Sequence, residues 1–369
     1  MREYLICMFA AAFVTLLATP IARAAAIKAN ALAEVRDRDV HDRPTPRWGG
    51  LAMFFGVAVG ILLATKLPLM SSVFDANRSA LGVLSAAAIL VVLGLIDDKW
   101  PLDAPIKLTV QVFAAGVMAL NGVVISWIPL GSIIVLDPTV GVFITVLLVL
   151  VTVNAVNFVD GLDGLAAGVV GIAAFSFFLY AYTLSVVEGY LRATLPTLLS
   201  ALVVGAVIGF LPHNFYPARI FMGDTGSMML GLILAAISII LIGQLDPAAI
   251  DSTAALPALL PVLLPVFVIV IPLADLLLAI FRRTKAGKNP FTPDKKHLHH
   301  LLLERGHSQG GAAMLMYATA AVFALPAVSV AFIPIWLSIL SFLIGLGLLI
   351  GFLARRPRSK KFTPVGDLR

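Results

Sequence analysis

Eleven apolar runs of about 20 residues each restrict this chain to a membrane fold more than any other feature. They lie roughly at residues 4–26, 48–68, 79–96, 104–123, 139–158, 162–184, 193–212, 225–244, 255–281, 312–332 and 333–354. A run of this length crosses the hydrocarbon core as a helix, because a helix satisfies its own backbone hydrogen bonds without water. Only 12% of the residues are charged and the mean hydropathy is +1.02. Soluble domains carry about 25% charged residues.

These runs predict an all-α polytopic membrane protein with about eleven transmembrane helices, forming one domain over residues 1–369. The last two runs require a very tight turn at Ile333-Pro334. The net charge of +6 does not indicate nucleic acid, because membrane proteins collect basic residues in their cytoplasmic loops. We therefore expect membrane lipid, and no nucleic acid, as a partner.

The basic residues predict the orientation. With the N-terminus outside, the loops after the odd-numbered runs and the C-terminal tail lie in the cytoplasm. These segments and their flanks hold 22 of the 26 Lys and Arg residues, all except Arg2, Lys66, Arg78 and Arg192. Such an excess is typical of cytoplasmic loops. The main cytoplasmic segments are residues 29–47, residues 282–311 and the basic tail 355–369. We expect the tail to contact anionic lipid.

Two amides and two carboxylates stand at the end of the fifth apolar run, after the uninterrupted apolar stretch Val140 to Val153. They are Asn154, Asn157, Asp160 and Asp163, spaced by three and interrupted by Gly161 and Gly164. Neighbours three apart share a helix face, so these side chains are suited to converge on a cation or a sugar. Polar groups at this depth are costly unless they are paired, solvated or bound. The alternative is a solvated helix end.

Asp97-Asp98 and Asp224 stand at two other ends of apolar runs. Adjacent carboxylates repel unless a cation intervenes, so the pair is suited to bind a divalent metal, to act as a base, or to do both. Asp224 is either an ordinary N-cap or a magnesium ligand beside a helix N-terminus that receives phosphate. Phe221 precedes it and is suited to stack on a base or simply to pack.

The longest loop carries a cationic cluster: Lys295, Lys296, His297, His299 and His300. Such a cluster suits a pyrophosphate. Zinc is the rival ligand, but no cysteine lies nearby to complete a site. A Pro/Gly turn with Thr45 and Arg47 precedes the second run and is suited to present cations and amides to a phosphate. Asp275, inside the ninth run, serves equally well as a structural pair or a catalytic group.

Five motifs in this order resemble the polyprenyl-phosphate N-acetylhexosamine-1-phosphate transferases. They are Pro-Thr-Pro…Gly-Gly, Asp97-Asp98, Asn-x-x-Asn-x-x-Asp-Gly-Leu-Asp-Gly, Phe-Met-Gly-Asp-x-Gly-Ser and His-x-His-His, within about residues 36–308. The histidine motif with its preceding lysines is similar to the WecA-like branch, whereas the related MraY enzymes have a contiguous histidine run. Asp97-Asp98-Lys-Trp-Pro-Leu-Asp is most similar to actinobacterial members, whose acceptor is decaprenyl phosphate.

The resemblance implies transfer of N-acetylglucosamine 1-phosphate from UDP-GlcNAc to a polyprenyl phosphate, either undecaprenyl or decaprenyl, with release of UMP. It implies an Mg²⁺ cofactor, with Mn²⁺ as a substitute, and an active site on the cytoplasmic face of the cell membrane. Asp224 would bind the metal with Asp97 or Asp98, and one of that pair would serve as a base. A homodimer is also compatible with the resemblance.

The remaining roles follow the matching motifs. The catalytic candidates are Asp97, Asp98, Asp160 and Asp163. The substrate-binding candidates are Asn154, Asn157, Asp163, Phe221, Lys295, Lys296, His297, His299, His300, Thr45 and Arg47. Phe221 would lie under the uracil, and the histidines would meet the pyrophosphate or the sugar. Two alternatives stay open: the same chemistry on another UDP-sugar, such as UDP-MurNAc-pentapeptide, or a secondary transporter.

Overall fold

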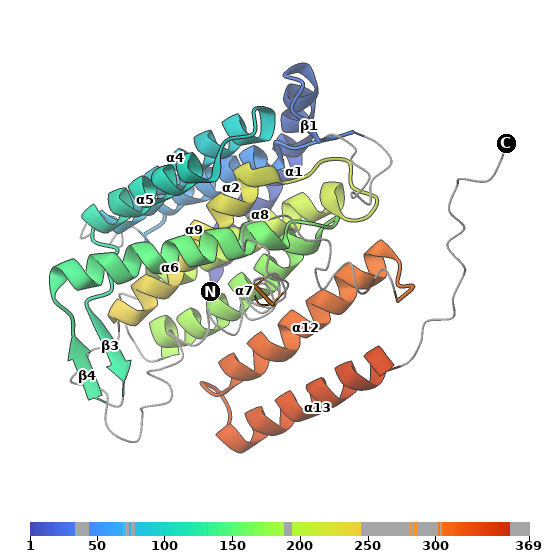
Figure 1. Ribbon diagram of the computed structural model, residues 1–369. Helices are drawn as coiled ribbons and strands as arrows, with labels where there is room; N and C mark the ends of the chain where they lie inside the picture. The colour runs from blue at the N-terminus through green and yellow to red at the C-terminus, as the bar shows by residue number, and fades with distance from the viewer. Residues whose placement is uncertain are drawn as a thin grey trace.

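The computed structural model describes residues 1–33, 44–68, 78–130, 132–187, 194–244 and 305–354, together with single positions between them. Its helices lie side by side in a bundle (Figure 1). They are α1 Arg2–Lys28, α2 Gly49–Ala64, α4 Ser79–Lys99, α5 Ala104–Leu120, α6 Pro138–Val159, α7 Leu165–Tyr182, α8 Thr194–Asn214, α9 Gly223–Gln244, α12 Gln309–Ser329 and α13 Ile335–Ala354. A π-helical turn, η1 Thr183–Val187, extends α7.

The helices confirm most of the predicted spans. Eight helices in the described part of the chain are long and apolar enough to cross a membrane, and α2 and α5 are shorter apolar helices. The ninth predicted run, 255–281, lies almost entirely outside the described residues, so eleven crossings are not established. The protein is therefore a polytopic helical membrane protein of at least eight candidate spans.

Two short antiparallel strand pairs were not predicted from the sequence. Strand β1 Leu32–Ala33 pairs with β2 Thr45–Pro46, next to the second helix. Strands β3 Trp127–Leu130 and β4 Ser132–Val135 form a hairpin between α5 and α6, at the opposite end of the bundle from β2 (Figure 1). Ile133, Ile134 and Val135 in the second strand are β-branched and favour extended backbone.

Helix α9 forms the centre of the bundle. It packs against α2, α4, α6 and α8, and 94% of its most apolar stretch is buried. Its sequence is apolar on every side, as expected for a helix surrounded by other helices. Glycines allow the close contacts, since a Cβ at Gly94 or Gly50 would collide with the first turn of α9.

Helices α12 and α13 form a hairpin on the outside of the bundle (Figure 1). Helix α12 packs on α7, while only 11% of the apolar stretch of α13 is buried. The predicted two-residue turn at Ile333-Pro334 is too short: α12 ends at Ser329, and the five residues 330–334 join it to α13. Ser329 Oγ lies 2.8 Å from Ser338 Oγ across this connection. The outer face of α13 is left for lipid.

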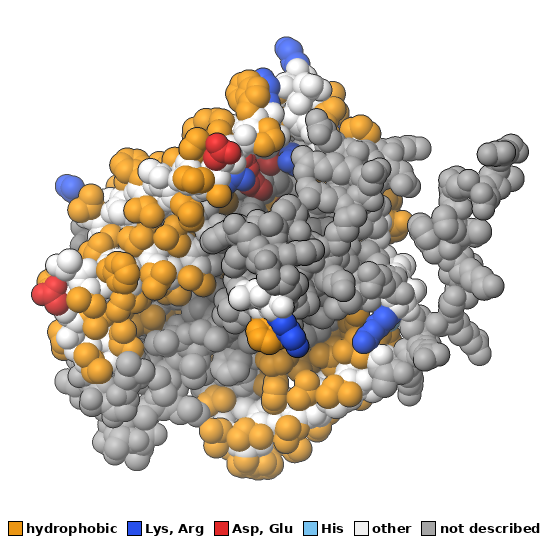
Figure 2. Space-filling view, in the orientation of Figure 1, with side chains coloured by type: hydrophobic (Ala, Val, Ile, Leu, Met, Phe, Trp, Pro, Cys, Tyr) orange, Lys and Arg blue, Asp and Glu red, His pale blue; other side chains and the backbone are white. Residues whose placement is uncertain are grey.

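Most of the described surface in Figure 2 is hydrophobic, as a bilayer-facing surface requires. Acidic and basic side chains lie together in a small area near the top of this view. The end of α4, the start of α5, the end of α6 and the start of α9 meet through hydrogen bonds and ion pairs at one end of the bundle. Within the described residues, the motifs that contain Asp97-Asp98, Asn157 and Asp224 therefore meet at one end.

Candidate active site

Two backbone loops, residues 45–50 and 221–223, bring the N-termini of α2 and α9 together. The Phe221 amide donates to the Pro46 carbonyl at 2.7 Å. The amides of Gly49 and Gly50 donate to the carbonyls of Phe221 and Met222, both at 2.9 Å. A side chain at Gly50 would collide with the backbone of Gly226, so this contact requires glycine.

Asp98 caps the N-terminus of α9. Its Oδ1 accepts the Asp224 amide at 2.9 Å, and its Oδ2 accepts the amide and hydroxyl of Thr225 at 3.2 and 2.7 Å. The side chain is only 5% exposed. These donors are among those that a helix start leaves without partners. Gly223 makes the approach possible, because its φ is +68° and a Cβ there would meet the Asp98 carboxylate.

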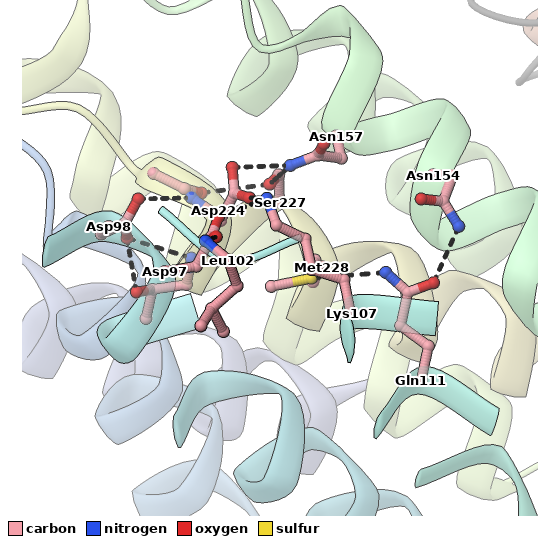
Figure 3. A network of polar contacts seen from close by, with 12 residues as sticks. Asp97, Asp98, Leu102, Lys107, Gln111, Asn154, Asn157, Asp224, Ser227 and Met228 are labelled. Carbon is pink, nitrogen blue, oxygen red and sulfur yellow. Dashed lines mark hydrogen bonds and ion pairs between the residues drawn. The ribbon is translucent and has the colours of Figure 1, made fainter. Parts of the chain in front are cut away.

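Asp97 and Asp224 face a common cation. The Lys107 Nζ, from the first turn of α5, forms ion pairs with Asp97 Oδ2 and with Asp224 Oδ2, the latter at 2.9 Å (Figure 3). Asp97 Oδ1 accepts the Leu102 amide at 2.7 Å, which fixes the other half of this carboxylate. Asp224 keeps 26% of its side chain exposed and is the more accessible of the two carboxylates.

Asn157 orients the second carboxylate. Its Nδ2 donates to Asp224 Oδ1 and to Ser227 Oγ, both at 2.9 Å (Figure 3). Asp224 is thus held from α5 by Lys107 and from α6 by Asn157.

Asn154 lies in a separate contact, one turn earlier on α6. Its Nδ2 donates to Gln111 Oε1 at 2.8 Å, and Gln111 Nε2 donates to Met228 Sδ at 3.5 Å (Figure 3). Gln111 is one turn after Lys107 on α5, so the two polar contacts run side by side between the same helices. The Asn154 side chain therefore joins α5 and α6, and its role in substrate binding stays a prediction.

Asp160 follows the last residue of α6 and keeps some contact with solvent. Burial raises the pKa of its carboxyl most. Repulsion from Asp224 and Asp98 raises it further, while Arg47 opposes the shift, and the result is a pKa of about 8. Asp160 therefore lies within electrostatic range of the carboxylates on α4 and α9 and of the Arg47 guanidinium.

Asp163 and Phe221 border the same end of the bundle. Asp163 is 3% exposed, and its Oδ2 accepts the Ala218 amide at 2.8 Å. Asn214 Nδ2 donates to the Ile220 carbonyl at 2.9 Å and holds the other side of this loop. Phe221 is partly exposed, whereas Thr45 is buried in β2. Asp163 thus positions the loop that leads to Phe221.

Several predicted residues fall outside the described residues. They are Lys295, Lys296, His297, His299, His300 and Asp275. The cationic loop, its zinc alternative and the role of Asp275 stay predictions. Within the described ranges, no three His, Cys, Asp or Glu side chains lie close enough together to form a metal site by themselves.

Asp97 and Asp224 nonetheless suit magnesium. Mg²⁺ binds proteins through one or two carboxylates and takes its other ligands from water and substrate phosphates. Both carboxylates already contact one cation, the Lys107 ammonium. The donor atoms are oxygens only, which favours Mg²⁺ or Mn²⁺ over the softer metals.

Lys107 and Gln111 were not identified from the sequence as site residues. Both lie inside the fourth predicted apolar run, 104–123, where a polar side chain is itself a signal. A lysine and a glutamine in a membrane helix are costly unless they have partners, so each indicates a functional or structural contact.

Comparison with known proteins gives consistent matches. The family described as glycosyl transferase family 4 matches residues 80–242. Decaprenyl-phosphate N-acetylglucosaminephosphotransferase of Mycolicibacterium smegmatis is 43% identical over 339 residues, 90% of this chain and 83% of the relative. The Mycobacterium tuberculosis protein of the same name is 43% identical over 334 residues, 89% and 83% of the two chains. Undecaprenyl-phosphate alpha-N-acetylglucosaminyl 1-phosphate transferase of Salmonella typhi is 29% identical over 349 residues, which are 91% of this chain and 87% of the relative.

Proposed function

The chain belongs to glycosyl transferase family 4, and we propose that it transfers N-acetylglucosamine 1-phosphate to a polyprenyl phosphate. Its relatives carry this activity in their names, and their likeness covers about nine-tenths of the chain. One structural observation supports the proposal independently of sequence similarity. Three separate motifs meet at one end of the helix bundle, through Asp97, Asp224 and Asn157. A secondary transporter would place its polar groups near the membrane midplane.

We propose UDP-GlcNAc as the donor. An oxygen of the acceptor phosphate attacks the phosphorus that carries the sugar, and a new P–O bond forms. The bond from that phosphorus to the bridging oxygen breaks, and the bridging oxygen leaves with UMP. The product is a polyprenyl pyrophosphoryl N-acetylglucosamine. Such transfers depend on positioning and on charge stabilisation more than on covalent chemistry by the protein.

Asp224 and Asp97 are the residues that would hold magnesium. When bound, the ion neutralises charge on the two phosphates that must approach each other. Asn157 keeps the Asp224 carboxylate oriented through its 2.9 Å hydrogen bond. Lys107 supplies a second positive charge at the same point, so the phosphates meet a cationic rather than an anionic surface.

The geometry favours a reaction without a dedicated base. Both oxygens of Asp98 are engaged in capping α9, which makes this carboxylate a support for Asp224. A phosphate monoester has a second pKa of about 6 and is largely ionised at neutral pH. The acceptor therefore needs no proton removed before it attacks.

We propose that the reaction takes place at the cytoplasmic face of the cell membrane. The acceptor is a lipid and the nucleotide is soluble, so the site must lie at a membrane surface. The excess of basic residues in the loops predicted at this end supports the cytoplasm as that side of the membrane. The homodimer and the length of the lipid stay predictions.

A direct assay tests the proposal. Purified protein is incubated with radiolabelled UDP-GlcNAc and decaprenyl or undecaprenyl phosphate, with Mg²⁺, with Mn²⁺ or with EDTA. We expect labelled lipid and UMP in equal amounts with either ion and neither product with EDTA. UDP-MurNAc-pentapeptide serves as the competing donor. Turnover of that donor alone would overturn the proposed sugar, and metal-independent turnover would overturn the proposed ion.

A further inference from the structure

Tyr317, on the outer helix α12, contacts the acidic turn between α6 and α7. Its hydroxyl donates to the Gly164 carbonyl at 2.5 Å. Its ring lies against Gly168, where an added Cβ would collide with the ring carbons and the hydroxyl. Tyr317 belongs to none of the motifs discussed above, and α12 packs on α7 through this region.

Gly164 has a conformation that few other residues adopt. Its φ is +72°, and it begins α7 directly after Asp163. Its carbonyl also accepts the Gly168 amide at 2.9 Å. A Cβ at Gly164 would lie 3.1 Å from the Tyr317 hydroxyl and 3.3 Å from the Phe215 ring. The turn is therefore enclosed by α12 on one side and by the loop after α8 on the other.

The same turn sets the direction of two carboxylates. Asp163 immediately precedes Gly164 and accepts the Ala218 amide, which fixes the loop leading to Phe221. Asp160 lies at the start of the turn, where its carboxyl interacts with Asp224 and Arg47. A shift of the Gly164 carbonyl would move Asp163 and, through Ala218, the loop beyond it.

We propose that Tyr317 is a positioning residue for binding of the nucleotide-sugar: its hydroxyl fixes the Gly164 carbonyl and so the acidic turn, residues 160–164. This inference rests on the proposed function. The ring alone would fill the space beside Gly168. The hydroxyl makes the hydrogen bond to the Gly164 carbonyl, so it is the part of the side chain that the positioning requires. Replacing Tyr317 by Phe separates the two roles, because the ring stays and only the hydroxyl is lost.

The test compares steady-state kinetics of the full-length wild type, Tyr317→Phe and Tyr4→Phe. Tyr4 is the matched control, since its hydroxyl lies 3.3 Å from Ser185 Oγ in a contact remote from the turn. We expect Tyr317→Phe to raise KM for UDP-GlcNAc roughly two- to tenfold, the usual effect of one hydrogen bond, with a smaller change in kcat. Tyr4→Phe should leave both constants unchanged.

Gly168→Ala gives a second test, because its Cβ must displace the Tyr317 ring. We expect a larger rise in KM than for Tyr317→Phe. Hydrogen exchange of amides 161–168 should also become faster in both variants, and this readout does not require turnover. Inactive wild type with faster exchange in Tyr317→Phe would overturn the proposed function, while still showing that the Tyr317 hydroxyl fixes the turn at residues 160–164. Active wild type with unchanged KM and unchanged exchange in Tyr317→Phe would overturn the inference.

Discussion

At the residue scale, the adjacent carboxylates Asp97 and Asp98 have different surroundings. Successive residues on a helix point about 100° apart, so one side chain of such a pair faces a neighbour that the other cannot reach. Asp98 faces the start of α9, and both of its carboxylate oxygens accept hydrogen bonds from backbone amides there. Asp97 faces Lys107 and, through it, Asp224. We therefore propose Asp97, rather than Asp98, as the partner of Asp224 in binding the metal.

Replacing Asp224 by Asn tests the proposed metal ligand. The substitution keeps the shape of the side chain but removes the charge that Mg²⁺ needs. We expect turnover to fall about a hundredfold or more, because charge stabilisation by the ion is worth several kcal/mol. Asp137→Asn is the control, since Asp137 only caps α6 by accepting the Thr139 amide at 2.9 Å. Near-normal turnover of Asp224→Asn would leave this residue a structural group.

Asp160 gives a pH dependence of stability. Its pKa is about 8 in the folded protein and near the ordinary value of 3.8 when unfolded, so between these values the folded state holds a proton that the unfolded state has lost. Stability should therefore fall as the pH rises from about 4 to 8, and level off above about 8. Asp160→Asn should weaken this fall.

The measurement is the thermal unfolding midpoint of the detergent-solubilised protein in EDTA, followed by tryptophan fluorescence. Wild type and Asp160→Asn are compared across the pH range, with Asp137→Asn as the reference for a loss of charge elsewhere. Midpoints that change in parallel in wild type and Asp160→Asn would contradict the assigned pKa.

At the element scale, small residues let α4 reach the start of α9. A Cβ at Gly94 would collide with the backbone of Asp224 and Thr225, which carry the site. We expect Gly94→Ala to destabilise the fold by about 1–3 kcal/mol, the usual cost of overpacking. Turnover should fall as well, because relieving the clash separates α4 from α9 and so shifts Asp97 relative to Asp224.

Gly116→Ala on α5 provides the matched control, since nothing lies within 4 Å of its added Cβ. Alanine favours a helix over glycine by about 1 kcal/mol, so this variant should be as stable as wild type or more so. The measurements are the unfolding midpoint and the specific activity of Gly94→Ala and of Gly116→Ala. Equal behaviour of both would show that the close contact between α4 and α9 is not needed.

At the scale of the whole molecule, the orientation in the membrane can be tested by cysteine labelling. On a Cys7→Ala background, Ser308→Cys lies before α12 at the end of the bundle that carries the site, and Thr139→Cys lies at the opposite end. Both positions are exposed. An impermeant thiol reagent should label Thr139→Cys in intact cells and spare Ser308→Cys until the membrane is opened. The reverse labelling would place the site outside the cytoplasm.

The sequence by itself determined the membrane class, ten of the helices and the positions of the motifs. Apolar length and the distribution of basic residues are local properties, so they can be read without knowing which helices touch. The connection between α12 and α13 is an exception: the apolar runs predicted a turn at Ile333-Pro334, whereas α12 ends at Ser329, because apolar residues alone do not show where a helix ends.

Only the tertiary structure decided which polar residues meet. Asn154 and Asn157 occur in one motif, yet one joins α5 to α6 and the other orients Asp224. Lys107 lies outside every motif, yet it links Asp97 to Asp224. These contacts depend on how each helix is rotated about its axis. That rotation is set by the packing of α9 against Gly50 and Gly94, which lie more than a hundred residues before α9 in the chain.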